Sequence, residues 1–158
     1  MKRRYSLVAI GGTFDNLHRG HIAIVSKALE VGDEVIIGLT TSRMVKRLAK
    51  KHPVASYKER KCSLLEYLKK AKALDRVRIL PLNNPYGPTV KREDVEAIVV
   101  SYETASRADE INQIRKQKGM KLLAIVKVPM VLAENGEPIY STRIHMGEID
   151  RSGRMLKP

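Results

Sequence analysis

The feature that most constrains the fold is a regular alternation of short apolar runs with helical patterns along the chain. Five runs have the length and β-branched content of buried strands. They lie at about residues 5–10, 34–40, 76–80, 97–100 and 122–128. Helical patterns lie between them at about residues 21–31, 42–48, 56–70 and 105–117, and Ser141 is expected to cap a last short helix.

Strands joined by helical crossovers form parallel sheets whose two faces are both covered. The sequence therefore predicts an α/β fold, a Rossmann-like five-stranded parallel sheet with helices on both faces. We find no linker, repeat or low-complexity stretch, so residues 1–158 are expected to form a single domain. In such sheets ligands bind beyond the carboxyl ends of the strands, where the strand order reverses. The loop after the first strand is the first place to look for chemistry.

The apolar runs are too short for a membrane protein. Hydrophobic residues make up 43% of the 158 residues, but no run approaches the roughly 20 needed to cross a bilayer. The apolar run Ser6–Ile10 that follows the basic start is too short for a signal-peptide core. The single cysteine, Cys62, cannot form an internal disulfide. We expect a cytoplasmic protein with no membrane contact.

The formal charge of +13, from 30 Lys and Arg against 17 Asp and Glu, favours anionic partners. Nucleic acid is one candidate and a polyphosphate substrate is another. The basic residues are spread along the chain, and one Phe, six Tyr and no Trp provide few stacking surfaces for bases. A solvated basic surface is the favoured interpretation, and a nucleic-acid-binding module is the weaker alternative.

The loop after the first strand combines residue types that suit phosphate binding. Gly11 and Gly12 permit a tight turn and a close approach to a ligand. His18 and His21 fall at the start of the next helix, where free N–H groups and the helix dipole favour anions. Thr13 adds a hydroxyl donor.

Other readings of this loop fit less well. It contains neither the Gly-Lys-Ser/Thr ending of a Walker loop nor the Gly-x-Gly-x-x-Gly dinucleotide fingerprint. Zinc binding is a weak alternative because no third ligand lies nearby in the sequence. A pair of histidines that merely caps the helix is the alternative, but the preceding Gly-Thr-Phe-Asp at a strand end favours a binding loop.

Two motifs resemble the nucleotidylyltransferase superfamily, whose members transfer a nucleoside monophosphate from a triphosphate. The first comprises Gly12-Thr13-Phe14-Asp15 and His18-Arg19-Gly20-His21. The second, Ile-Ser-Ser-Thr followed by a basic residue, is matched by Ile139–His145. In that match Tyr140 replaces the first serine and His145 stands where arginine is usual, which leaves Arg143 and His145 as candidates for the arginine's phosphate contact.

Three further stretches narrow the resemblance to archaeal phosphopantetheine adenylyltransferases. They are Asn84-Pro85-Tyr86-Gly87-Pro88, Val99-Val100-Ser101-Tyr102-Glu103-Thr104 and Ile111-Asn112-Gln113-Ile114-Arg115. The resemblance implies transfer of AMP from ATP to 4′-phosphopantetheine, giving dephospho-coenzyme A and pyrophosphate. Glycerol phosphate, a flavin or nicotinamide mononucleotide are the acceptors of related transferases and remain alternatives.

The resemblance also implies site residues. His21 would donate to the α-phosphate, His18 would contact the phosphates of ATP, and Thr13 would orient the incoming phosphate. A lysine should bridge the substrates; Lys51 matches best, with Lys46 and Lys50 as rivals. The ATP-binding set is Gly11, Gly12, Thr13, Phe14, His18, His21, Ser141, Thr142 and Arg143. The acceptor-binding set is Lys46, Lys51, Asn84, Pro85, Tyr86, Gly87 and Arg115.

The implied reaction needs alignment and charge neutralisation more than proton transfer. A phosphate monoester is largely dianionic at neutral pH because its second pKa is about 6. We therefore expect direct in-line displacement with no catalytic base. Asp15 is expected to shape the loop, and Mg²⁺ is expected to accompany ATP, held by phosphate oxygens and water. A homo-oligomer is left open.

Overall fold

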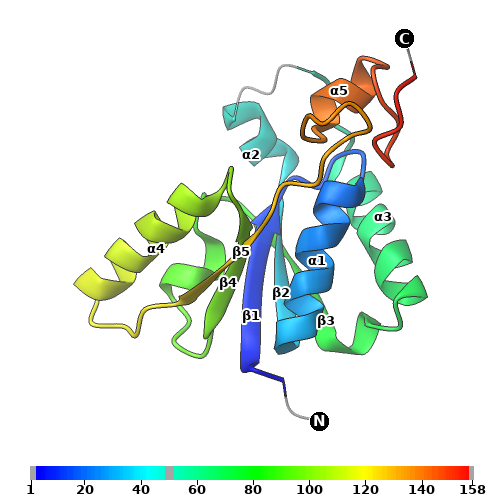
Figure 1. Cartoon of the computed structure of the whole chain (residues 1–158). Helices are drawn as coiled ribbons and strands as arrows, with labels where there is room; N and C mark the ends of the chain where they lie inside the picture. The colour runs from blue at the N-terminus through cyan, green and yellow to red at the C-terminus, as the bar shows by residue number, and fades with distance from the viewer. Residues whose placement is uncertain (1–2, 49–51, 157–158) are drawn as a thin grey trace.

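The computed structural model describes residues 3–48 and 52–156, and its centre is a five-stranded sheet (Figure 1). Neighbouring strands pair in parallel in the order β3-β2-β1-β4-β5. The strands are β1 (Tyr5–Gly12), β2 (Gly32–Thr40), β3 (Val77–Leu82), β4 (Ala97–Ser101) and β5 (Ala124–Val128). The predicted α/β fold class is confirmed.

The helices cover both faces of the sheet and its carboxyl edge. They are α1 (Arg19–Val31), α2 (Ser42–Arg47), α3 (Tyr57–Lys70), α4 (Ala105–Gln117) and α5 (Ser141–His145), with 3₁₀ turns η1 (Leu74–Arg76) and η2 (Gly87–Val90). In Figure 1, α1 and α3 lie on one face, α4 lies on the other, and α2 and α5 lie beyond the carboxyl ends of the strands. Within the described residues, no helix combines the length and apolar character needed to cross a membrane.

Helix boundaries follow local capping chemistry. Ser56 accepts a hydrogen bond from the N–H of Glu59, as its capping pattern predicts. The last helix differs from expectation by one residue, because Tyr140 is the N-cap and Ser141 is the first helical residue. The hydroxyl of Ser141 is therefore available for a contact outside its own helix.

The core follows the two-residue period of the strands. On β1, Val8 and Ile10 pack with α1 and α3 on one face of the sheet. Leu7 and Ala9 point the opposite way and pack with α4 and the segment around η2. Both faces are therefore buried, as expected for a parallel sheet.

The sheet opens where the strand order reverses, between β1 and β4. β1 pairs with β2 from Tyr5 to Gly12, but its pairing with β4 ends at Ala9 and Ile98. Since β1 continues to Gly12 and β4 to Ser101, their carboxyl ends separate above the last pair. A crevice is thereby available at the topological switch point.

Candidate active site

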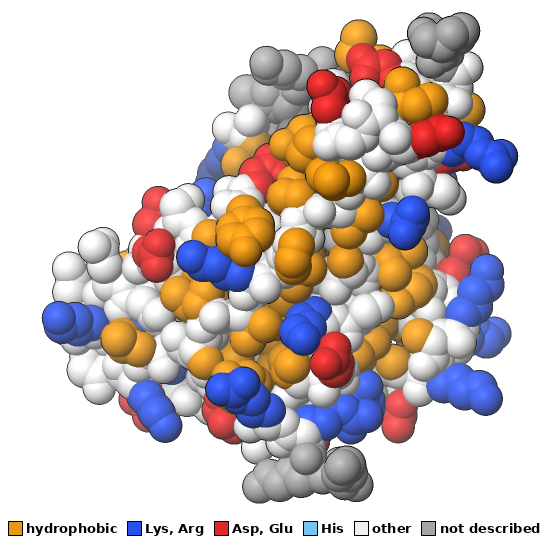
Figure 2. Space-filling model, viewed as in Figure 1, with side chains coloured by type: hydrophobic (Ala, Val, Ile, Leu, Met, Phe, Trp, Pro, Cys, Tyr) orange, Lys and Arg blue, Asp and Glu red, His pale blue; other side chains and the backbone are white. Residues whose placement is uncertain are grey.

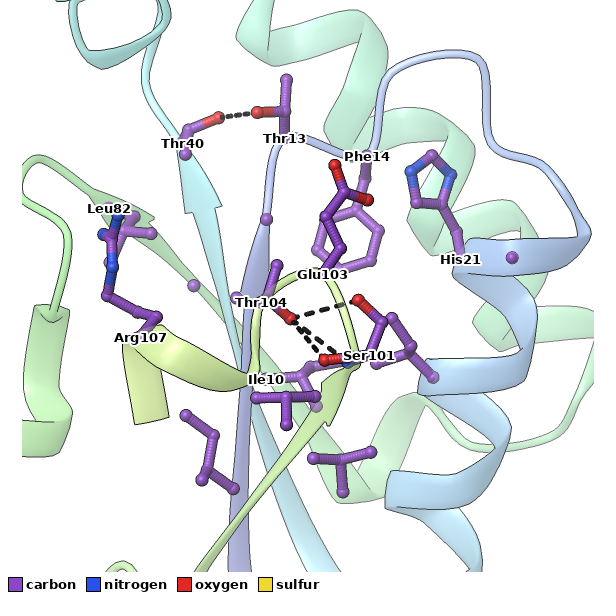
Figure 3. Close-up of a pocket in the computed structure, with 18 of the residues that line it drawn as sticks. Ile10, Thr13, Phe14, His21, Thr40, Leu82, Ser101, Glu103, Thr104 and Arg107 are labelled. Atoms are coloured by element: carbon purple, nitrogen blue, oxygen red, sulfur yellow. Dashed lines mark hydrogen bonds between the residues drawn. The ribbon is translucent and has the colours of Figure 1, made fainter. Parts of the chain in front are cut away.

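A cavity of about 650 Å³ occupies this crevice, and all five strands contribute to its lining (Figure 3). Their contributions include Gly12, Thr40, Leu82, Val100 and Val128, all at or near carboxyl ends. The loop after β1 provides Thr13, Phe14, Asp15, His18 and His21, and the start of α5 provides Ser141 and Thr142. Most of the predicted ATP-binding set therefore surrounds one cavity.

The two histidines form a reciprocal capping box at the start of α1. Nδ1 of His18 accepts a hydrogen bond from the N–H of Gly20 at 3.0 Å, and Nδ1 of His21 accepts from the N–H of His18 at 3.2 Å. An accepting nitrogen carries no proton, so the proton of each neutral imidazole is on Nε2. The capping box thus selects the tautomer of both rings.

The rings of His18 and His21 stack with centroids 3.7 Å apart. His18 is only 6% exposed, and burial lowers its pKa to about 4, so it is neutral at pH 7. Helix capping uses only Nδ1 of each ring. Because both residues also line the cavity, capping does not exhaust their role.

Gly20 is required for this arrangement, which sequence reasoning did not recognise. A Cβ on Gly20 would lie 2.8 Å from Cε1 and 3.0 Å from Nδ1 of His18. Any larger residue would displace the ring that accepts the Gly20 N–H. The glycine between the histidines therefore serves ring placement.

Phe14 and Asn16 have left-handed backbones, with φ of 53° and 49°. Such residues cost roughly 1–2 kcal/mol each, so the surrounding contacts must hold the loop in place. The Phe14 side chain is 2% exposed in the core, and its ring centroid is 5.3 Å from that of His21. Because the side chain is buried, the backbone of Phe14 is the part that can make the predicted contact with ATP.

Asp15 ties the loop to two other segments. Its Oδ1 accepts from the N–H of Ala55 at 3.1 Å, and its carbonyl accepts from the hydroxyl of Ser141 at 2.7 Å. These contacts agree with the predicted shaping role of Asp15. They also place the start of α5 against the first loop.

A pair of hydroxyl groups, one just after β1 and one at the end of β2, lies on the cavity wall. Thr40 donates from Oγ1 to Oγ1 of Thr13 at 3.1 Å (Figure 3). Arg60, which is 2% exposed on α3, donates to the carbonyls of both threonines. Sequence reasoning identified Thr13 alone, since nothing local marks Thr40 or Arg60 as its partners.

The described part of the structure does not place any of the three predicted bridging lysines in the cavity lining. Lys51, the preferred choice, and Lys50 lie outside the described residues. Lys46 is exposed on α2 and does not line the main cavity. It lines a neighbouring hollow of about 340 Å³ together with His52 and Arg60.

In the loop after β3, some residues line the cavity and others hold the turn in shape. Pro85 and Tyr86 line the cavity. Asn84 is exposed, and its Oδ1 accepts from the N–H groups of Tyr86 and Gly87. Gly87 has a φ of 55°, and a Cβ there would lie 2.5 Å from Leu82. Asn84 and Gly87, predicted to bind the acceptor, thus shape the turn that presents their neighbours.

Arg115, which is predicted to contact the acceptor, is a buried side chain on α4. It is 1% exposed and lies outside the cavity lining. Its guanidinium donates to the carbonyls of Thr89 (2.7 Å), Arg92 (3.0 Å) and Val95 (3.4 Å), and Nε donates to that of Lys121 (2.7 Å). The side chain therefore joins α4 to η2 and to the segment that follows η2, and its contact with the acceptor remains a prediction.

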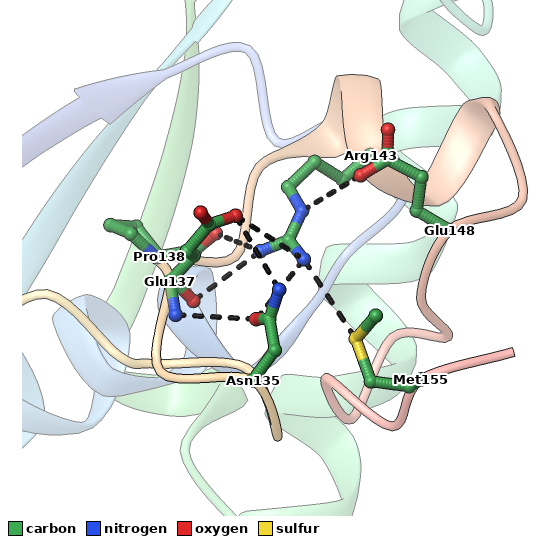
Figure 4. A network of polar contacts seen from close by, with 6 residues as sticks. All are labelled: Asn135, Glu137, Pro138, Arg143, Glu148 and Met155. Atoms are coloured by element: carbon green, nitrogen blue, oxygen red, sulfur yellow. Dashed lines mark hydrogen bonds and ion pairs between the residues drawn. The ribbon is translucent and has the colours of Figure 1, made fainter. Parts of the chain in front are cut away.

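Arg143 lies outside the cavity lining, and its guanidinium belongs to a network of polar contacts (Figure 4). Nε pairs with Glu148 at 3.1 Å, Nη1 donates to the Pro138 carbonyl at 2.8 Å, and Nη2 donates to Asn135 at 3.2 Å. The rival candidate His145 is exposed, with its ring centroid 5.3 Å from that of His52. Neither residue is part of the described cavity lining.

Little of the basic charge of the described residues lines the cavity. Lys and Arg side chains are spread over the visible face and do not gather in one patch (Figure 2). Among the described residues that line the cavity, Arg107 is the single Lys or Arg. Its Nε is 3.3 Å from Glu110, which also lines the cavity.

Comparison with known proteins decides the family. Residues 9–147 match the family described as cytidylyltransferase-like. A phosphopantetheine adenylyltransferase of Methanosarcina mazei is 50% identical over 153 residues, which are 95% of this chain and 97% of the relative. This chain belongs to the archaeal phosphopantetheine adenylyltransferase family.

Some members of the phosphopantetheine adenylyltransferase family are longer. A bifunctional phosphopantetheine adenylyltransferase/NTP phosphatase of Thermoplasma volcanium is 47% identical over 152 residues, and this chain spans 45% of its length. A solved structure from Archaeoglobus fulgidus, described as a protein of unknown function, is 36% identical with a TM-score of 0.70. It covers 81% of this chain and 89% of its own.

The described part of this adenylyltransferase contains no group of three or more His, Cys, Asp or Glu residues that could hold a metal ion. The family relationship and the cavity therefore direct attention to the imidazole and hydroxyl groups. The residues predicted to bind ATP and the acceptor remain predictions, and all of them except Lys51 lie within the described part of the chain.

Proposed function

We propose that the chain transfers AMP from ATP to 4′-phosphopantetheine, forming dephospho-coenzyme A and pyrophosphate. The observation that carries the proposal is the histidine pair, whose tautomers are set by the capping box, on the wall of a switch-point cavity. Membership of the phosphopantetheine adenylyltransferase family supports the choice of both substrates.

The cavity has two walls of different character. His18, His21, Ser141 and Thr142 lie on the wall formed by α1 and α5, where the positive end of the α1 dipole favours phosphate. We assign this wall to ATP. The opposite wall carries the loop of Pro85 and Tyr86 and the start of α4, and we assign it to the pantetheine arm.

The reaction is an in-line displacement at the α-phosphorus of ATP. An oxygen of the acceptor's phosphate forms a bond to this phosphorus, and the bond to the bridging oxygen breaks, so that pyrophosphate leaves with its electron pair. The acceptor phosphate is already largely dianionic at neutral pH, and no side chain removes a proton. Alignment of the two substrates provides much of the acceleration.

The role of His21 follows from its tautomer. Nδ1 accepts from the backbone, so Nε2 carries the proton that is donated to an α-phosphate oxygen. This donation stabilises the charge that builds on the α-phosphate in the transition state. His18 contacts the ATP phosphates as a neutral donor, since its pKa is held near 4.

Magnesium enters this proposal with ATP. Mg²⁺ keeps several water ligands and binds phosphate oxygens, so the absence of a carboxylate cluster in the described residues is compatible with a Mg–ATP substrate. Lys51 is retained as the proposed bridge between substrates, with Lys46 and Lys50 as rivals. Cytoplasmic location and a homo-oligomer likewise remain predictions.

The proposal is tested by pyrophosphate release. The protein is mixed with Mg²⁺ and either ATP or CTP, and with 4′-phosphopantetheine, glycerol phosphate, riboflavin phosphate or nicotinamide mononucleotide. Rapid release is expected only with ATP and 4′-phosphopantetheine. Faster turnover with another acceptor would assign the chain a different transferase activity. Salt-dependent retention of duplex or single-stranded nucleic acid on a filter would favour the nucleic-acid alternative.

A further inference from the structure

A buried arginine connects three segments beneath the cavity. Nη1 of Arg60 donates to the carbonyl of Thr13 at 2.9 Å and to that of Thr40 at 2.7 Å. Nε donates to the carbonyl of Ala55 at 2.9 Å. Arg60 therefore fixes the ends of β1 and β2 against the segment that precedes α3.

The same arginine sets the direction of a hydroxyl chain. Nη1 of Arg60 also lies 3.4 Å from Oγ1 of Thr40, which accepts a longer contact from an N–H that is shared with a carbonyl. A hydroxyl has one proton, and that of Thr40 is donated to Oγ1 of Thr13 at 3.1 Å. The Thr13 oxygen is thus an acceptor toward Thr40, and its own proton is directed to another partner.

We infer that Thr40, polarised by Arg60, is a positioning residue that orients Thr13 to donate its proton to the phosphate of the acceptor. This series of hydrogen bonds would run from the Arg60 guanidinium to a phosphate dianion, so each hydrogen bond polarises the next in the same direction. This inference rests on the proposed function and assigns Thr40 and Arg60 a part in it.

The geometry favours the acceptor's phosphate over those of ATP. In-line attack places the incoming oxygen and the leaving pyrophosphate on opposite sides of the α-phosphorus. Figure 3 shows Thr13 turned toward Thr40, with His21 on the other side of the end of β1. A nucleotide held at the histidine wall therefore presents its α-phosphorus toward the threonine pair.

Substitutions of Thr40 test the inference. Thr40→Val keeps the shape but removes the donor, and we expect kcat/KM for 4′-phosphopantetheine to fall about tenfold, as for loss of one hydrogen bond to a charged group. The KM for ATP should not change. Thr40→Ser restores the hydroxyl and should recover the rate to within about twofold. Thr40→Ala provides a second hydroxyl-free variant if the valine packs badly against Arg60.

The adjacent Thr41 provides a matched control. Its hydroxyl accepts from the N–H of Met44 as the cap of α2 and has no part in the chain. Thr41→Val therefore removes a hydroxyl one residue away and should retain the wild-type kcat/KM for the acceptor. Thermal unfolding of each variant separates loss of stability from loss of rate.

A double-mutant cycle tests whether Thr40 acts through Thr13. In a Thr13→Val background, Thr40→Val should have almost no further effect on kcat/KM for the acceptor. Multiplicative effects, a serine variant as slow as the valine variant, or an equal rise in the KM for ATP would each overturn the inference. Failure of the wild-type protein to release pyrophosphate with 4′-phosphopantetheine would instead contradict the proposed function.

Discussion

At the scale of single residues, the two histidines of the first loop divide their work between their ring nitrogens. Nδ1 of each ring accepts a backbone N–H at the start of α1, and Nε2 carries the proton. A helix N-terminus usually receives Ser, Thr, Asp or Asn as its cap. With imidazoles in these positions, the hydrogen bonds that begin the helix also orient the donors proposed for phosphate.

The first prediction concerns His21. Replacing it with alanine should lower kcat at least 100-fold, because one positioned donor to the transition state contributes roughly 2.7–4 kcal/mol. Pyrophosphate release at saturating substrates measures the effect, and circular dichroism checks that the variant is folded. Glu66→Ala, at an exposed position on α3 outside the cavity lining, is the control and should retain wild-type turnover. Near-normal turnover of the alanine variant would remove His21 from the mechanism.

The second prediction concerns pH. Burial lowers the folded-state pKa of His18 from 6.5 to about 4, whereas in the unfolded chain the imidazole titrates near its ordinary value. Between these values the unfolded state binds more protons, so the free energy of unfolding falls as the pH decreases. It should fall by roughly 3 kcal/mol from this group alone, and the group contributes no further change above about pH 6.5.

Guanidinium denaturation of wild type and His18→Asn at successive pH values isolates that contribution. Asparagine can cap the helix but does not titrate in this range. The difference in stability between the two proteins should therefore shrink as the pH is lowered from 6.5 to 4. An identical pH dependence in both proteins would show that His18 is not held neutral by burial.

At the scale of elements, two buried arginines fasten loops to helices. Arg60 on α3 donates to the carbonyls of Thr13 and Thr40 at the ends of β1 and β2. Arg115 on α4 donates to the carbonyls of Thr89 in η2 and Val95 before β4. Each satisfies carbonyl groups that would otherwise be buried without partners. These contacts secure both walls of the cavity from beneath.

The third prediction distinguishes this role of Arg115 from substrate binding. Arg115→Lys cannot reproduce the forked contacts, and the carbonyls left unpaired should cost at least about 2 kcal/mol of stability. The KM values for ATP and acceptor should not change. Arg92→Lys, which alters an exposed pair with Asp94, is the matched control and should cost less than about 1 kcal/mol. A raised KM for the acceptor at unchanged stability would restore Arg115 to the binding site.

At the scale of the whole molecule, most of the positive charge of the described residues lies outside the cavity lining, where Arg107 is the single Lys or Arg. Such a field attracts anionic substrates over a distance without holding them tightly. The fourth prediction is that kcat/KM for both substrates falls as ionic strength rises from about 0.01 to 0.15 M, where the screening length shortens from about 30 to 8 Å. The value of kcat should change much less. A kcat/KM independent of salt would contradict steering by this charge.

The order of elements could be predicted because each is encoded by local periodicity, and α4 occupies the predicted residues 105–117. β3 runs past its predicted end at Leu80 to Leu82, because an edge strand tolerates Pro81. The first loop could be predicted because its residues are contiguous. The structural roles of Thr40, Arg60 and Arg115 could not be predicted, since most of their partners lie 20 or more residues away and no local signal marks a buried arginine among 30 basic residues.

The reversal of strand order at β1 has a practical consequence for engineering. The residues proposed to bind the nucleotide lie in segments 11–21 and 139–142. The facing wall, proposed to bind the pantetheine arm, comes from segment 82–111. Because these stretches are separate in the gene, a library confined to 82–111 can search for unnatural acceptors while the AMP-donating machinery keeps its native sequence. The part of the chain proposed to select the acceptor can therefore be varied separately from the part proposed to bind the nucleotide.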